Sequence, residues 1–141
     1  LPHNGVYKKS STEKKIRVVF DASPKHRGKC LNDALLPGPM LQNELPQVLT
    51  KFREGDVAFG ADIDAMFSQI RLQKQDTRNH RFLWKEKDSN VINTYQMDRL
   101  AFGDTSSPCE AIYITRRTAE DYGKGQEEAV RAINENLYVD N

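Results

Sequence analysis

Two carboxylates, Asp62 and Asp64, lie between an apolar run and a short helix-like segment. The run over residues 57–61 predicts a buried strand, and the helical spacing over 66–70 predicts the helix. A carboxylate at such a junction can cap the helix by accepting N–H bonds, a contact worth about 1 kcal/mol. It can also bind a hard divalent cation, which prefers oxygen ligands. The spacing by itself favours the cap and leaves cation binding open.

The composition sets outer limits on the class of protein. The chain has 141 residues, enough for one domain with a core, with 38% hydrophobic and 29% charged residues and a mean hydropathy of −0.72. No apolar run reaches the roughly 18 residues of a membrane span. Cys30 and Cys109 form neither a disulfide framework nor a metal pattern, so a reducing compartment is expected. The start without Met and the end at Asn141 suggest a fragment.

The charge is unevenly distributed along the chain. Residues 1–35 contain eight Lys or Arg and three acids, or 8 − 3 = +5, so the remainder carries 1 − 5 = −4. A basic segment of this kind is either a solvated face or a site for phosphates. The pattern leaves both uses open.

Alternating apolar and polar residues predict two β-hairpins. The first joins residues 6–9 to 15–20, and the second joins 81–85 to 91–97 across a turn at 88–90.

Helices are expected from Asn43 to Gly55, from Pro108 to Tyr122 and from Glu127 to Asn134. Asn43 is expected to cap the first of these, and Ser106 or Ser107 to cap the second. A last apolar run over 137–141 predicts a strand that enters a turn.

The remaining polar residues favour ordinary roles. His3, His26 and His80 show no ligand spacing, which indicates surface or loop positions. Arg116 and Arg117 could face a template, but a solvated helix face is the preferred interpretation.

Four blocks occur in a fixed order: RVVFDAS at 17–23, ADIDAMFSQI at 61–70, FGDTSSP at 102–108 and YVDN at 138–141. Together they resemble the fingers and palm of a retroelement reverse transcriptase. The opening LPH…GVYK and the segment LLPGP at 35–39 resemble the BEL/Pao class of LTR retrotransposons.

The resemblance implies an α/β (α+β) fold, in which helices back an antiparallel palm sheet. About residues 1–60 would be mostly fingers and about 61–141 palm with part of the fingers, within a single partial domain that lacks the thumb.

The activity implied is that of an RNA-directed DNA polymerase, which adds deoxynucleotides to a primer with two Mg²⁺ ions, or Mn²⁺. By resemblance Asp62 and Asp140 are the shared catalytic carboxylates and metal ligands, joined by the carbonyl of Ile63 and by Asn141. Such ions stabilise both the attacking and the leaving oxygen.

The resemblance also implies a nucleotide site. Arg17 and Lys8 or Lys9 would grip the triphosphate, a task that suits cations. Phe67 would exclude a ribose 2′-hydroxyl, with core packing as its alternative role. Phe102 and Gly103 would line the nucleotide and template side. The nucleotide-binding residues that the resemblance implies are therefore Lys8, Lys9, Arg17, Phe67, Phe102 and Gly103.

One departure from the family concerns Asn141, which stands where a second aspartate is usual. The amide removes a negative charge, so weaker Mg²⁺ binding is expected. Two alternatives follow: a catalytically silent nucleic-acid-binding remnant, and a structural interaction domain in which Asp62 is only a cap. The expected partners are a primed RNA or DNA template, deoxynucleoside triphosphates and the rest of a polyprotein, in a virus-like particle or the nucleus and without a membrane.

Overall fold

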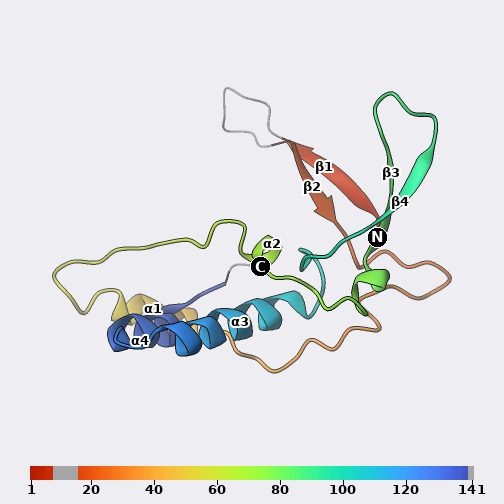
Figure 1. Ribbon diagram of the computed structural model, residues 1–141. Helices are drawn as coiled ribbons and strands as arrows, with labels where there is room; N and C mark the ends of the chain where they lie inside the picture. The colour runs from red at the N-terminus through yellow and green to blue at the C-terminus, as the bar shows by residue number, and fades with distance from the viewer. Residues whose placement is uncertain (8–15, 140–141) are drawn as a thin grey trace. The chain divides into compact units, whose positions relative to one another are not determined.

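The structure is a computed structural model that describes residues 1–7 and 16–139. It is a mixed α+β structure with two antiparallel two-stranded hairpins and four α-helices in the described residues (Figure 1). The chain divides into two compact units. The first comprises Leu1–Leu36 and Phe67–Ser107, and the second comprises Pro37–Met66 and Pro108–Asn141. The predicted division near residue 60 concerns subdomains of the family and stays a prediction.

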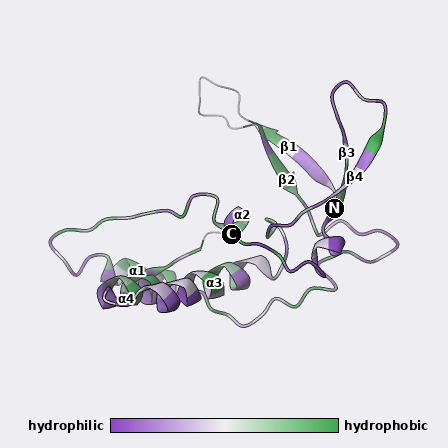
Figure 2. Cartoon of the chain, viewed as in Figure 1, coloured by the Kyte–Doolittle hydropathy of each residue, from purple (hydrophilic) through white to green (hydrophobic). Residues whose placement is uncertain are grey.

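Both predicted hairpins are confirmed in the first unit. Strand β1 (His3–Tyr7) pairs with β2 (Ile16–Phe20), and β3 (Arg81–Lys85) pairs with β4 (Ile92–Gln96). β-Branched and aromatic residues favour such strands, and Figure 2 shows β2 as hydrophobic over most of its length. The first hairpin begins earlier than the sequence indicated, at His3.

Aromatic rings join the two hairpins of this unit. The ring centroids of Phe20 and Phe82 lie 5.0 Å apart with an edge-on geometry, and that of His3 lies 5.6 Å from Trp84. The amino group of Leu1 also donates to the carbonyl of Arg81. Such ring pairs stabilise beyond the apolar area they bury.

Small and apolar residues form the core of the first unit beside the short helix α2 (Met66–Gln69). Ala22, Ile70, Leu100 and Ala101 are buried. The amide of Leu100 donates to the carbonyl of Ile70 at 3.0 Å. This contact joins the chain after α2 to the chain after the second hairpin. Between them lies the 3₁₀ turn η1 (Thr77–Asn79).

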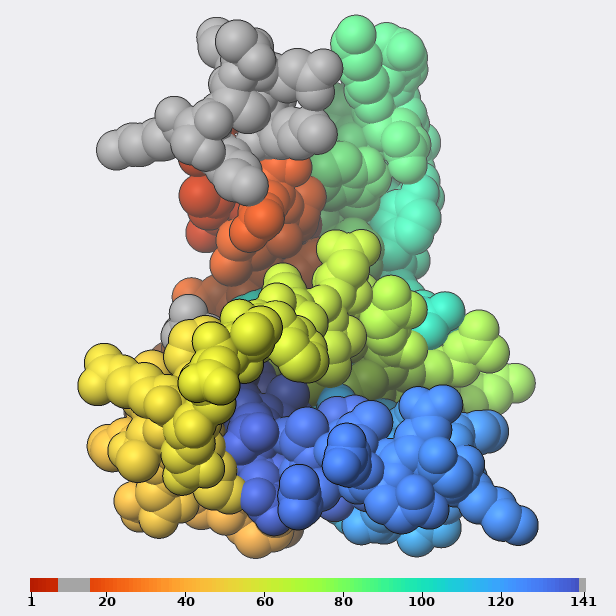
Figure 3. Space-filling model, turned by 90° about the vertical axis from the view of Figure 1, so that its left-hand side faces the viewer, coloured from red at the N-terminus to blue at the C-terminus, as the bar shows by residue number. Residues whose placement is uncertain are grey.

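The second unit contains three helices: α1 (Leu45–Lys51), α3 (Ser107–Tyr122), which begins at the last residue of the first unit, and α4 (Glu127–Asn136). The predicted helices therefore exist, with α1 shorter than expected. Helices α1 and α4 lie side by side (Figures 1 and 3), and Lys51 Nζ lies 2.5 Å from Glu135 Oε2.

The predicted cap of α1 is wrong. Glu44 occupies the N-cap position, and Pro46 lies in the first turn as expected. The amide of Asn43 instead donates to the carbonyls of Asn134 at 3.1 Å and Leu137 at 2.9 Å. The last carbonyls of a helix have no partner within the helix. The Asn43 side chain therefore bonds carbonyls at the end of α4 and does not cap α1.

Two predicted strands are absent from the described residues. Residues 57–61 form no strand, and Val57 and Phe59 are each 86% exposed. A strand needs a neighbour for its N–H and C=O groups, and no described segment pairs with this run. Residues 137–139 are also irregular, because the Gln42 side chain accepts from the N–H of Val139 and donates to its carbonyl. Residues 140 and 141 lie outside the described part.

None of the helices within the described residues is long and apolar enough to cross a bilayer.

Candidate functional site

An aromatic pair joins two of the sequence blocks within the first unit. Helix α2 buries Phe67, which is 5% exposed, and its ring centroid lies 4.3 Å from that of Phe102. Phe102 remains 57% exposed. The buried ring therefore belongs to the core and also supports an exposed ring, which fits the core-packing interpretation, and its role toward a 2′-hydroxyl stays a prediction.

Gly103 follows Phe102 in a conformation that suits glycine. Its φ is +96°, and a Cβ there would lie 3.0 Å from the carbonyl oxygen of Phe20. The position thus requires a positive φ and a close backbone approach to the end of β2. The structure places Phe67 beside Phe102, the residue before Gly103, and the role of these residues toward a nucleotide stays a prediction.

Side-chain hydrogen bonds hold the loop around Gly103. Asn32 Nδ2 donates to the Gly103 carbonyl at 3.0 Å, and the amide of Thr105 donates to Asn32 Oδ1 at 2.9 Å. The buried hydroxyl of Ser107 donates to the carbonyl of Ala101 at 2.6 Å. Ser107 is the first residue of α3, but its hydroxyl donates to the loop and does not accept an N–H of the helix in this contact, so it does not act as the predicted cap there.

His80 corrects the prediction that the histidines occupy surface or loop positions. It is buried, and its Nε2 lies 2.7 Å from Asp104 Oδ2, which is also buried. The two residues are far apart in the sequence and follow no recognised motif spacing, so no local pattern indicated this pair. His3 lies in β1 among aromatic rings, and His26 is exposed in a loop.

Asp62 lies exposed in an irregular segment, five residues before Phe67. Among the described residues it has neither a hydrogen bond nor an ion pair, so the capping role has no contact to support it. The carbonyl of Ile63 accepts from the amide of Met66 at 3.2 Å, and a carbonyl oxygen can accept a second interaction. Carboxylate and carbonyl oxygens are ligands of the kind that Mg²⁺ takes.

The other predicted ligands cannot be placed beside Asp62. Asp140, Asn141, Lys8 and Lys9 lie outside the described residues. Within residues 1–7 and 16–139, no group of three or more His, Cys, Asp or Glu side chains is arranged to hold a metal ion. The two-carboxylate metal site therefore stays a prediction.

Arg17 lies on β2, opposite Val6, and is exposed. Its guanidinium is therefore accessible to a phosphate from solvent. Arg117 is also exposed, and it pairs with Asp121 at 2.8 Å. Arg116 departs from the predicted solvated face, because it is half-buried and donates to Asn43 Oδ1 at 3.0 Å.

Asp21, in the block that contains Arg17, accepts the backbone N–H of Ser23 at 2.9 Å. This hydrogen bond, followed by one from the Ser23 side chain, holds the pKa of Asp21 below its ordinary value of 3.8. The carboxylate thereby stabilises the turn that follows β2.

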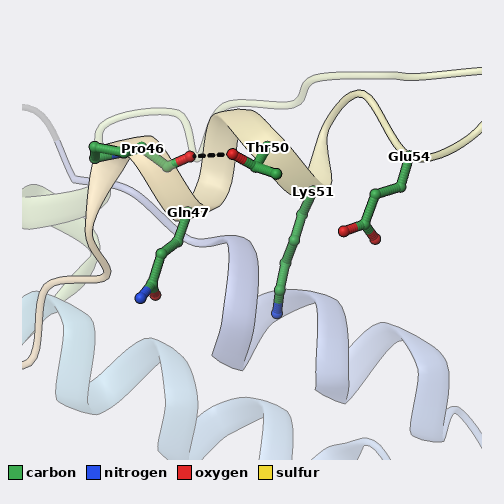
Figure 4. Close-up of a pocket in the computed structure, with 5 residues that line it drawn as sticks. All are labelled: Pro46, Gln47, Thr50, Lys51 and Glu54. Carbon is green, nitrogen blue, oxygen red and sulfur yellow. Dashed lines mark hydrogen bonds between the residues drawn. The ribbon is translucent and has the colours of Figure 1, made fainter.

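The surface hollows lie away from these residues. One, of about 340 Å³, is open and runs along α1 (Figure 4), and Lys51 extends from it toward α4. Another, of about 520 Å³, is lined by Gln73, Lys74, Gln75 and Arg78. Neither contains a residue that the sequence indicated for the site.

Comparisons with protein-family models, with curated proteins and with solved structures gave no match for this chain.

Proposed function

We propose that this chain is a fingers-and-palm part of an RNA-directed DNA polymerase. The observation that carries the proposal is the group formed by Phe67, Phe102 and Gly103. Two of the four sequence blocks supply these residues, and the contact between the rings of Phe67 and Phe102 supports the proposal. Phe102 packs on the buried ring of Phe67 and is itself 57% exposed, so its ring is accessible to a substrate.

The reaction is an in-line attack of a primer 3′-hydroxyl on the innermost phosphate of a deoxynucleoside triphosphate. Two Mg²⁺ ions would supply charge stabilisation at the attacking and leaving oxygens. Asp62, the Ile63 carbonyl and Asp140 would hold them. The exposed carboxylate of Asp62 fits this role, because it makes no hydrogen bond or ion pair with any of the described residues.

The protein's own groups would bind and select the nucleotide. The exposed guanidinium of Arg17 offers paired donors to the triphosphate. Gly103 lets the backbone approach the substrate without a side chain between them. Phe67, which packs against Phe102, would oppose a 2′-hydroxyl and thereby favour deoxynucleotides.

The test is primer extension on an RNA template, with this chain carried in a complete polymerase. Asp62→Asn should lower the extension rate by roughly 100-fold or more, since it weakens the binding of the Mg²⁺ ions that would stabilise the attacking and leaving oxygens. Asp56→Asn is the matched control, because Asp56 is exposed in the same irregular segment. An unchanged rate in Asp62→Asn would overturn the proposal.

A second candidate is a catalytically silent nucleic-acid-binding remnant, and Asn141 favours it. Salt-dependent binding of a primer-template without extension, not rescued by Asn141→Asp, would select this function. Absence of both Mg²⁺-dependent and polyanion binding would instead select a structural interaction domain.

A further inference from the structure

The segment from Leu100 to Thr105 is held by hydrogen bonds, and its one aromatic side chain is exposed. Leu100, Ala101 and Asp104 are 2%, 1% and 4% exposed, whereas Phe102 is 57% exposed. We refer to residues 100–105 as the Phe102 loop. Its backbone is bonded to Ile70, Asn32 and Ser107. The loop is therefore a fixed support for one exposed ring and one glycine.

The His80–Asp104 pair is the buried ionisable contact of this loop. Nε2 of His80 lies 2.7 Å from Asp104 Oδ2, and the side chains are 7% and 2% exposed. Nδ1 of His80 faces a second acceptor, the carbonyl of Asp76, at 3.3 Å. Two acceptors at one ring match the doubly protonated imidazolium, which donates from both nitrogens.

Stability alone does not explain the pair. Desolvation can cancel the attraction within a buried ion pair, and apolar residues of similar volume often stabilise a core as well or better. Asp104 Oδ1 is also buried without a hydrogen-bond partner among the described residues, which adds a further cost. A directional bond does, however, fix a backbone in a way that apolar packing does not.

We propose that His80 and Asp104 are positioning residues that fix the Phe102 loop, and thereby Phe102 and Gly103, for the incoming nucleotide. The pair fastens Asp104, which directly follows Gly103, to His80 at the end of η1. Leu100, at the other end of the loop, is bonded to Ile70. The part of this inference that concerns the nucleotide rests on the proposed function. The part that concerns the loop does not.

The experiment separates positioning from stability with an apolar replacement. The single variant His80→Leu removes the hydrogen-bond partner of the buried Asp104 carboxylate, and Asp104→Ala removes the acceptor at His80 Nε2, so each should lower Tm. In the double variant most of this decrease in Tm should be reversed. In the double variant the Thr105 amide, which donates to Asn32, should nevertheless exchange with solvent about tenfold faster than in the parent. Asp104→Asn, whose carbonyl oxygen still accepts from His80, should restore part of the protection.

Binding of a deoxynucleoside triphosphate to the same 141-residue variants, measured by calorimetry, gives the second readout. The double variant should bind about tenfold more weakly than the parent, because small displacements of a positioned group cost affinity. His26→Leu is the matched control, since His26 is exposed in a loop, and it should change neither readout.

The outcomes are distinct. Thr105 exchange within twofold of the parent in the stable double variant would overturn the positioning role. Faster exchange in a chain whose parent binds no deoxynucleotide would support the positioning of the loop and refute the proposed function. Faster exchange together with unchanged nucleotide affinity would refute the link between the two.

Discussion

Gly103 shows how a single residue can be fixed by its backbone. Its positive φ strains any residue that has a Cβ, and the carbonyl of Phe20 occupies the space that the Cβ would need. Gly28 has a similar φ, +78°, but nothing lies within 4 Å of its Cβ position. Both positions therefore have the strain of a positive φ, but only Gly103 also has a backbone atom close to the position of a Cβ.

We predict that Gly103→Ala lowers the free energy of unfolding by about 2–3 kcal/mol, and Gly28→Ala by about 1 kcal/mol. The difference arises because only Gly103 meets a backbone oxygen that cannot easily move. Urea denaturation of the two variants beside the parent gives the comparison. Equal decreases in the free energy of unfolding in the two variants would show that the close approach to the Phe20 carbonyl does not contribute to the cost.

A pH dependence is expected at Asp21. Because the amide of Ser23 bonds its ionised form, the pKa of this carboxyl lies below the ordinary value of 3.8. A lowered folded pKa gives stability that is present above the ordinary value and is lost as the pH falls through the folded value. A ¹³C NMR titration of the carboxyl should find the midpoint below 3.8. Ser23→Ala, which keeps the N–H, should raise the pKa only in part; a midpoint above the ordinary value in the parent would contradict the contact.

At the scale of elements, side chains determine the path of the chain after α4. Gln42 makes two hydrogen bonds to Val139, at 2.7 and 3.2 Å, and Asn43 bonds the carbonyl of Leu137 at 2.9 Å. These bonds occupy backbone groups that a neighbouring strand would otherwise use. The segment before α1 therefore holds the segment that precedes Asp140 in the sequence.

We expect Gln42→Ala to speed hydrogen exchange at the Val139 amide and to lower the free energy of unfolding by about 1–2 kcal/mol, since two partly buried hydrogen bonds are lost. Gln47→Ala serves as the control, because Gln47 is exposed on α1 (Figure 4). NMR exchange rates measure the effect. A Val139 amide that exchanges equally fast in parent and Gln42→Ala would mean that the two bonds do not hold the segment.

At the scale of the whole molecule, the two compact units differ in charge. In the first unit, Leu1–Leu36 carries 8 − 3 = +5 and Phe67–Ser107 carries 7 − 5 = +2, or +7 together. The net charge of +1 leaves 1 − 7 = −6 for the second unit. A basic unit attracts polyanions, whereas acidic groups repel them unless cations intervene.

This difference predicts that a nucleic acid binds through the first unit. Each Lys or Arg that contacts a single strand contributes about 0.7 to the slope of log K against log salt. Arg17→Gln should therefore reduce that slope by about 0.7, measured by fluorescence anisotropy with a single-stranded oligonucleotide. Arg131→Gln, in the second unit, should leave the slope unchanged. Equal slopes for the parent and both variants would exclude Arg17 from the contact.

Local sequence patterns were sufficient for the hairpins and for α3 and α4, because alternation, turn residues and helical spacing act within a few residues. The resemblance named Phe67 and Phe102 among the nucleotide residues, which stays a prediction, and the structure places their rings in contact. Only the tertiary structure decided that His80 meets Asp104, that Asn43 bonds the end of α4 and that residues 57–61 form no strand. Each of these depends on whether a distant donor, acceptor or strand is present, and spacing along the chain carries no information about that.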